Sequence, residues 1–90
     1  MSLYKKQAIL DSMEDITLIQ LQTLKFIHGF YSTNGYPPSI VEIATANNVA
    51  GNAIQGRVNS LIKKSFLTKK PKIARSLLLT EKGMSAITLQ

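Results

Sequence analysis

The chain has 90 residues, of which 44% are hydrophobic and 18% charged, so it has the size and composition of one small folded domain and not of a disordered tail. It contains no cysteine and one histidine, which excludes a disulfide scaffold and a thiolate metal site, and no apolar run approaches the roughly 18 residues that span a bilayer. The net charge of +6 favours an anionic partner, most often nucleic acid and less often a membrane surface, or it marks a basic face that serves solubility.

The positive charge is concentrated in the second half of the chain. Residues 51–90 contain eight Lys or Arg and one Glu, whereas residues 1–50 contain three Lys and four Asp or Glu, so the net charges are +7 and −1. The start of the chain lacks the uninterrupted apolar core and the small-residue cleavage site of a secretory signal. We therefore expect a cytoplasmic protein with its partner surface in the second half.

Two helices are predicted in the first third of the chain. A short apolar pattern predicts a helix over residues 3–13, and a longer one with apolar residues every three or four positions predicts a helix over residues 18–33. Thr17 and Gln20 have the spacing of a capping box at the start of the longer helix. Gly35 favours the left-handed conformation that ends a helix.

The next predicted helix covers residues 40–47, after two prolines that keep the chain extended. Ser39 and Glu42 have the spacing of a second capping box. Ala44 supplies the small side chain that two helices need where they cross near a right angle. Asn48 is predicted to turn the chain sharply, because asparagine tolerates the left-handed conformation.

A further helix is predicted over residues 53–64, with Asn52 and Gln55 as a third capping box. Its predicted core face consists of Ile54, Val58, Leu61 and Ile62. Two helices joined by a turn of three or four residues, with an apolar residue in the turn, form a helix-turn-helix, which here covers about residues 39–64.

Short extended segments replace the helical pattern after this point. The segments FLTKK and RSLLLT flank PKIA, where Pro71 interrupts strand pairing, so we predict a two-stranded hairpin with a basic tip over about residues 66–80. A last short helix, from Thr80 to Leu89, is capped by Thr80 and weakened by Gly83.

These elements together predict a fold class. It is mainly α with a small β-hairpin: a winged helix-turn-helix with a three-helix core, a wing, and extra helices at both termini. We expect residues 1–90 to form a single domain of this kind.

Two parts of the sequence resemble known families. Residues 17–80 resemble the N-terminal DNA-binding domain of the LexA repressor family. The resemblance lies in the segment NGYPPSIVEIA, the helix-turn-helix that follows it, the segment SLIKKSFL and the basic hairpin. LLLTEKG is similar to the last wing strand and following helix of MarR-like regulators. Asn47 stands where that LexA pattern has an apolar residue and Ser65 where it has glycine, and the turn is one residue shorter. The 90 residues contain no protease half, so we expect no self-cleavage.

The resemblance implies that the solvent face of the helix over residues 53–64 enters the major groove of DNA, where Asn and Gln pair with adenine and Arg with guanine. The residues predicted to read bases are Asn52, Ala53, Gln55, Gly56, Arg57 and Asn59. The residues predicted to contact the DNA backbone are Ser39, at a helix N-terminus, and the basic residues Lys63, Lys64, Lys69, Lys70, Lys72 and Arg75. Gly56 lies away from the core face, and we hypothesise that it lets the helix backbone approach DNA closely.

Each of these assignments has a structural alternative. Lys63 and Lys64 are also explained as solvated charges at a helix C-terminus. The wing lysines also fit a role in keeping an edge strand from aggregating. Gln55 and Asn59 equally fit ordinary surface positions. The lone His28, with no Cys, Asp or Glu near it in sequence, is expected to be structural.

We therefore expect a sequence-specific transcriptional regulator that binds double-stranded DNA, at the nucleoid when bound. No cofactor, no metal, no catalysis and no membrane role are expected, because no catalytic constellation or long basic amphipathic helix is present. The alternative is a winged-helix module for protein–protein interaction in a larger assembly. The helices over residues 3–13 and 80–89 are the expected homodimer surface, or they cap the core of a monomer.

Overall fold

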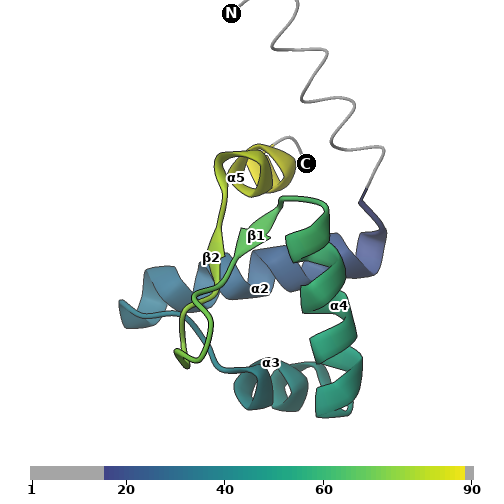
Figure 1. The fold of residues 1–90 in the computed structure, drawn as a ribbon, viewed down its shortest axis with the longest axis vertical. Coiled ribbons are helices and arrows are strands. Elements are labelled where there is room, and N and C mark those ends of the chain that lie inside the picture. Colours follow the sequence, from purple (N-terminus) through teal and green to yellow (C-terminus); the bar gives the residue numbers. More distant parts are fainter. Residues whose placement is uncertain (1–15, 89–90) are drawn as a thin grey trace, which may run out of the picture.

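The computed structural model of the protein describes residues 16–88, so the helix predicted over residues 3–13 lies outside the described part. The described elements, in chain order, are α2 (Leu18–Asn34), α3 (Ile40–Asn47), α4 (Gly51–Lys63), β1 (Leu67–Thr68), β2 (Leu78–Leu79) and α5 (Glu81–Thr88). Helix α2 crosses the middle of the molecule, with α3 at one end and α5 at the other (Figure 1). The predicted fold class is confirmed: residues 16–88 are mainly helical with a small antiparallel hairpin.

Helix α2 begins at the predicted residue and ends one residue later than predicted. The Thr17 hydroxyl accepts a hydrogen bond from the backbone N–H of Gln20 at 3.1 Å, and the Gln20 side chain accepts one from the backbone N–H of Thr17 at 3.2 Å. Gly35 follows the helix with φ 81°, where its N–H donates to the Tyr31 carbonyl. These bonds satisfy backbone groups that a helix leaves unpaired at its ends.

Helix α3 has the predicted boundaries, and the chain turns as predicted after it. Ser39 and Glu42 form a capping box, with bonds of 2.9 and 3.2 Å between the side chain of each and the backbone N–H of the other. Asn48 adopts the left-handed conformation, with φ 54° and ψ 47°. Val49 then packs against the core from inside the turn.

The start of α4 differs from the prediction. Asn52 is not the capping residue, because α4 begins at Gly51 and Ala50 precedes it as the N-cap residue. The turn that begins at Asn48 returns the chain to the helical conformation sooner than predicted, and the backbone N–H of Ile54 already bonds to the Ala50 carbonyl at 3.3 Å. Asn52 therefore lies inside the first turn, exposed to solvent.

One core joins all the described elements. The fully or nearly buried hydrophobic side chains are Leu21, Leu24, Ile27, Ile43, Ile54, Val58, Leu61, Phe66, Leu67, Leu77 and Ala86. Ala44 is buried where α3 packs against α4, as the crossing of the two helices requires. Ile62, predicted to be in the core, is half-buried at its edge.

The hairpin places its loop beside the helix-turn-helix. Strands β1 and β2 pair in antiparallel register, with Leu67 opposite Leu79 and Thr68 opposite Leu78. β1 packs against α4 and β2 against α2 (Figure 1). We call the connection between the strands, residues 69–77, the wing loop.

Helix α5 is capped by Thr80, as predicted. The Thr80 hydroxyl accepts from the backbone N–H of Gly83 at 3.0 Å and donates to the Ser65 carbonyl at 2.6 Å. Gly83 is buried, and a Cβ atom at this position would collide with the backbone carbonyl of Phe66. The glycine that the sequence pattern marks as a weak point thus allows α5 to pack closely on the end of β1.

Candidate nucleic-acid interface

The exposed face of α4 forms the centre of the candidate interface. Asn52, Gly56, Asn59 and Lys63 are all exposed and follow one another at intervals of four, three and four residues. Because an α-helix has about 3.6 residues per turn, these intervals align the four residues along one stripe. We call these four residues the exposed stripe of α4.

Gln55 and Arg57 flank this stripe from different sides. Two positions along a helix correspond to a rotation of about 200°, so the two side chains point in nearly opposite directions. Gln55 Nε2 donates a hydrogen bond to Asn59 Oδ1 at 3.0 Å. The structure therefore brings Gln55 and Asn59 together and separates both from Arg57, on whose side the exposed Ala53 lies.

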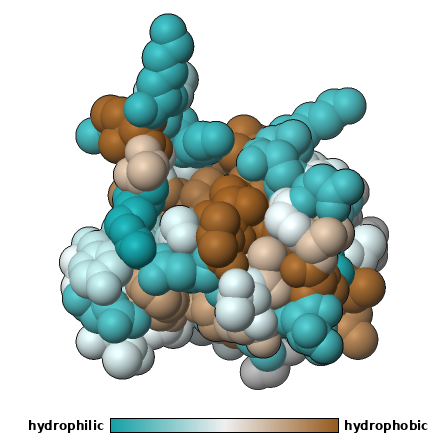
Figure 2. Space-filling model, turned by 90° about the horizontal axis from the view of Figure 1, so that it is seen from below, coloured by the Kyte–Doolittle hydropathy of each residue, from teal (hydrophilic) through white to brown (hydrophobic). Residues whose placement is uncertain are grey.

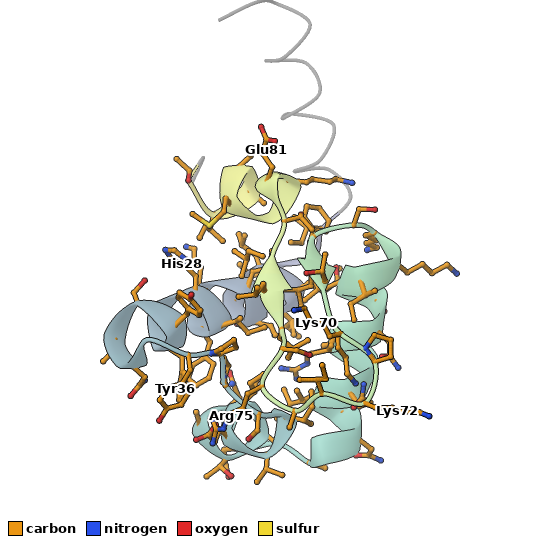
Figure 3. All side chains as sticks on the ribbon, turned by 60° about the vertical axis from the view of Figure 1, so that its left-hand side comes forward. His28, Tyr36, Lys70, Lys72, Arg75 and Glu81 are labelled. Atoms are coloured by element: carbon orange, nitrogen blue, oxygen red, sulfur yellow. The ribbon has the colours of Figure 1, made fainter. Side chains whose placement is uncertain are left out.

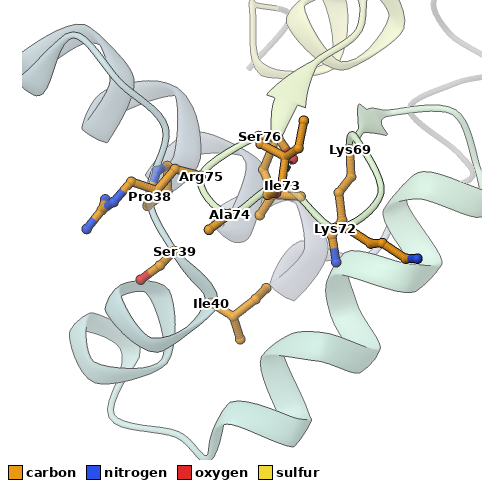
Figure 4. Close-up of a pocket in the computed structure, with 10 residues that line it drawn as sticks. Pro38, Ser39, Ile40, Lys69, Lys72, Ile73, Ala74, Arg75 and Ser76 are labelled. Atoms are coloured by element: carbon orange, nitrogen blue, oxygen red, sulfur yellow. Dashed lines mark hydrogen bonds between the residues drawn. The ribbon is translucent and has the colours of Figure 1, made fainter.

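The wing loop carries three exposed lysines. Lys69 and Lys72 extend from the side of the loop that faces α4, as Figure 4 shows. Ser76 holds the loop together: its hydroxyl accepts from the backbone N–H of Lys70 at 3.0 Å and donates to the Ile73 carbonyl at 2.8 Å. The basic tip predicted from the sequence is therefore a folded loop beside α4 (Figure 4).

A groove separates the wing loop from the start of α3. Its volume is about 260 Å³, and Ser39, Ile40, Lys69, Lys72 and Ile73 are among the residues that line it (Figure 4). Viewed from the side of α3, the surface shows apolar patches between hydrophilic side chains (Figure 2). The groove thus combines an apolar lining with lysines at its rim.

Lys63 and Lys64 face different surroundings. Lys63 belongs to the exposed stripe of α4. Lys64 is half-buried, and its Nζ donates a hydrogen bond to Gln20 Oε1 at 3.1 Å, at the N-terminus of α2. The structure therefore separates two neighbours that the sequence analysis assigned to one role.

Ser39 and Arg75 both bond to the carboxylate of Glu42. The backbone N–H and the hydroxyl of Ser39 are engaged in the capping box. Arg75 Nη1 lies 2.6 Å from Glu42 Oε1 and 3.3 Å from the Pro37 carbonyl, and its guanidinium lies 5.0 Å from the centre of the Tyr36 ring. Figure 3 shows Arg75 beside Tyr36 at the start of α3.

Arg75 and Glu42 each stabilise the charged form of the other. The hydrogen bond from Arg75 lowers the pKa of Glu42, and the backbone N–H of Ser39 lowers it further. The same contact with Glu42 raises the pKa of Arg75. Both side chains are therefore charged at neutral pH, and the start of α3 carries a carboxylate of its own.

Three side chains of this region could not be assigned to the site from the sequence pattern. Glu42 was recognised as a capping residue and not as the partner of Arg75, and no role was given to Tyr36 or to Ile73, which is 53% exposed on the wing loop. One signal was available: Glu42 is the only acidic residue between positions 16 and 80 of the sequence. Within residues 16–88, Glu42 and Glu81 were therefore the two candidate partners for a cation of the wing.

The described residues provide no competing metal site. Across residues 16–88, no three His, Cys, Asp or Glu side chains gather closely enough to hold a metal ion. His28 is half-buried and lines an apolar groove of about 290 Å³ with Tyr31, Leu78 and Met84. None of the helices in this part of the chain has the length and apolar character needed to cross a membrane.

Comparison with known proteins identifies relatives for most of the chain. Residues 13–76 match the family model described as LexA DNA binding domain. Curated LexA repressors are similar: that of Leuconostoc citreum is 38% identical over 72 residues, that of Limosilactobacillus fermentum 36% over 69, and that of Leuconostoc mesenteroides 39% over 72. Each alignment covers 76% of this chain and 33–34% of the relative, so the chain spans about a third of the length of these proteins.

Proposed function

The chain belongs to the LexA DNA-binding domain family, and from this premise we propose that it is a transcriptional regulator that binds double-stranded DNA sequence-specifically. One observation carries the proposal: α4, whose exposed stripe contains two asparagines and a glycine, lies beside a folded loop with three exposed lysines. A helix of this kind fits the major groove, and a basic loop beside it fits the phosphate backbone or the minor groove.

The proposed base-reading residues are those of α4. Asn52, Gln55 and Asn59 have amide side chains that pair with adenine. The guanidinium of Arg57, which points away from Gln55 and Asn59, suits a guanine on the other side of α4. Gly56 has no side chain and Ala53 has a small one, so the helix backbone can approach the base edges at these positions. The bond between Gln55 and Asn59 supports a joint role, because each orients the amide of the other.

The proposed phosphate contacts come from Lys63, Lys69, Lys70 and Lys72, all of which are exposed. Ser39, Lys64 and Arg75 were also predicted to contact the DNA backbone. In the free protein their polar groups bond to Glu42 or Gln20, so the proposal relies on the first four lysines for affinity.

A protein-interaction module is the second candidate function. A winged helix can serve that role, because fold alone does not determine function. The net charge of +7 over residues 51–90 favours DNA, since a protein adaptor has no need of lysines on both the wing loop and α4.

Further features complete the proposal. We place the protein in the cytoplasm, at the nucleoid when bound, as one domain over residues 1–90 that acts without catalysis or cofactor. It dimerises through α5, where Met84 is exposed, together with residues 3–13, which lie outside the described part. The similarity of LLLTEKG to MarR-like regulators supports a role of α5 beyond capping the core.

Selection of bound sites from a pool of random DNA duplexes tests the proposal. We expect enrichment of one sequence with two half-sites related by two-fold symmetry, because a dimer presents two α4 helices. A single, non-palindromic half-site would contradict the dimer. Binding to all duplexes alike would contradict sequence-specific reading, and no binding at low salt would favour the protein-interaction module.

A further inference from the structure

We infer that Arg75 is a positioning residue that holds the wing loop on the start of α3 through Glu42 and so sets where the wing lysines lie relative to α4. The inference rests on the proposed function only for its consequence in DNA binding. The contact itself is a property of the free protein and can be tested without DNA.

Arg75 contacts three groups from a distant part of the sequence. Its Nη1 atom donates to Glu42 Oε1 at 2.6 Å and to the Pro37 carbonyl at 3.3 Å, and its guanidinium lies 5.0 Å from the centre of the Tyr36 ring. The Tyr36 ring in turn meets Phe30 of α2 edge-on, with 5.7 Å between ring centres. One side chain of the wing loop is thus joined to α3, to the segment before it and, through Tyr36, to α2.

The partner groups are themselves fixed. Glu42 Oε1, the oxygen that Arg75 contacts, also accepts the backbone N–H of Ser39 at 2.9 Å in the capping box. The hydrogen bond at the start of α3 therefore fixes the position of the Glu42 carboxylate, which does not rotate freely. A charge-assisted hydrogen bond to such a fixed acceptor positions its donor better than an ion pair between two mobile side chains.

The backbone of the wing loop is constrained, so holding the Arg75 side chain in place also restricts the position of the loop. Lys72 and Arg75 have φ values of 64° and 56°, a conformation uncommon outside glycine that persists where surrounding contacts hold it. The Ser76 hydroxyl closes the loop by bonds to the backbone of Lys70 and Ile73. In Figure 4, Arg75 points to Pro38 and Ser39 while Lys69 and Lys72 point toward α4. Arg75 therefore lies on the α3 side of the loop, and Lys69 and Lys72 lie on the α4 side.

The same geometry argues against Arg75 as a phosphate ligand. A phosphate that approached its guanidinium would also approach the Glu42 carboxylate, 2.6 Å away, and would be repelled by it. Within residues 16–88, no acidic side chain lies within salt-bridge distance of the exposed lysines of the loop. A loop held in place before binding loses less conformational freedom when it meets DNA, which favours affinity.

Amide ¹⁵N relaxation of the free protein tests the positioning role directly. We expect Arg75→Gln to lower the order parameters of residues 69–76 other than Pro71, which has no amide proton, and Glu42→Gln to lower them less, because glutamine keeps the capping box and accepts a neutral hydrogen bond. Lys72→Gln removes a cation from the same loop and should leave the order parameters of the other loop residues unchanged. An unchanged loop in Arg75→Gln would overturn the inference.

A double-mutant cycle on DNA affinity separates positioning from phosphate contact. If Arg75 acts through Glu42, Arg75→Gln weakens binding by about threefold to tenfold in the wild type and by a clearly smaller factor in the Glu42→Gln background, where Arg75 keeps only a neutral hydrogen bond to position 42. If Arg75 contacts phosphate, the loss is at least as large in that background, because the competing carboxylate charge is gone. That second result would overturn the inference.

Lys69→Gln provides the matched control for the cycle. Lys69 is exposed on the same loop, so its loss should weaken binding by the same factor in both backgrounds. If no variant binds any duplex, the proposed function fails, while the order parameters still decide whether Arg75 holds the loop.

Discussion

At the scale of single residues, two glycines of the helical elements have opposite surroundings. Gly56 lies exposed in α4, and a Cβ atom added there would have open space around it. Gly83 lies buried in α5, and the same atom would collide with the carbonyl of Phe66. The same substitution to alanine therefore tests a functional role at one position and a packing role at the other.

Gly56→Ala is expected to raise the free energy of unfolding by about 1 kcal/mol, because alanine is the better helix former and has room for its methyl group. We also expect it to weaken DNA binding, since the methyl group would hold the α4 backbone away from the base edges. Urea denaturation and DNA titration measure the two effects. Higher stability with unchanged affinity would show that Gly56 is a tolerated defect in α4.

Gly83→Ala is expected to lower the free energy of unfolding by about 1–3 kcal/mol, because the added methyl group meets backbone that cannot move aside easily. Thermal unfolding followed by circular dichroism measures the change. Gly56→Ala is the matched control, since it places the same residue in a helix with open space. Equal stabilisation by both substitutions would contradict the close packing of α5 on Phe66.

At the scale of elements, the helices differ in how they begin. Thr17, Ser39 and Thr80 each cap the following helix with a side-chain oxygen. Helix α4 instead follows Ala50, whose methyl side chain has no oxygen to offer. The start of α4 therefore depends on the turn at Asn48 and on packing against α3, and not on a capping side chain.

Replacing two residues with alanine tests this difference. Ser39→Ala is expected to lower the free energy of unfolding by about 1 kcal/mol, the ordinary cost of losing an N-cap. Asn52→Ala is expected to change it by less than about 0.5 kcal/mol, because Asn52 is exposed inside the first turn of α4. Chemical denaturation of both variants measures the effects. A loss at Asn52 equal to that at Ser39 would contradict the observed start of α4.

The wing loop is expected to supply affinity without sequence preference. Combining Lys69→Ala with Lys70→Ala should weaken binding to all duplexes and reduce the slope of affinity against salt by about two, one for each lysine. Fluorescence anisotropy at several salt concentrations measures both quantities.

Asn59→Ala is the contrasting variant, since it should weaken binding to the selected site and leave non-specific binding and the salt slope unchanged. If the double lysine variant kept its affinity and slope, the wing loop would have to be removed from the interface.

At the scale of the whole molecule, the hairpin and the helix-turn-helix are coupled in two ways. The core joins them through Phe66 and Leu67, which are fully or nearly buried. At the surface, the ion pair between Arg75 and Glu42 joins the wing loop to α3. The core contact is insensitive to pH, whereas the surface contact depends on the ionisation of Glu42.

Acid is therefore expected to weaken the surface contact. The pKa of Glu42 is lower in the folded protein than in the unfolded chain, so its contribution to stability is complete above the unfolded pKa of about 4.3 and is lost as the pH falls through the folded pKa. We expect the difference in free energy of unfolding between wild type and Glu42→Gln to shrink between about pH 5 and pH 3. Thermal unfolding at several pH values measures this difference. The effect should be small because both groups are exposed. A difference that stayed constant with pH would contradict the linkage.

Local signals in the sequence were enough for most of the fold. The capping boxes at Thr17 and Ser39, the turn at Asn48 and the buried stripe of α4 follow from spacings of two to four residues, and the structure confirms them. The same periodicity placed Ala53, Gly56 and Asn59 on the solvent side of α4, where they are exposed, whereas Gln55 and Arg57 are half-buried. These features were predictable because each depends on neighbours within about one helical turn.

The remaining features depend on contacts between distant segments. The pattern at Asn52 and Gln55 is as good a capping box as the other two, yet packing of α4 on α3 starts the helix before it. Arg75 is one more basic residue in the sequence until the tertiary structure places Glu42 beside it. The sequence by itself determined the helices, the turn and the charge of the interface, because these are local or summed properties. Only the tertiary structure decided which cations remain free for a partner, because that depends on which acceptors the fold brings within hydrogen-bonding distance.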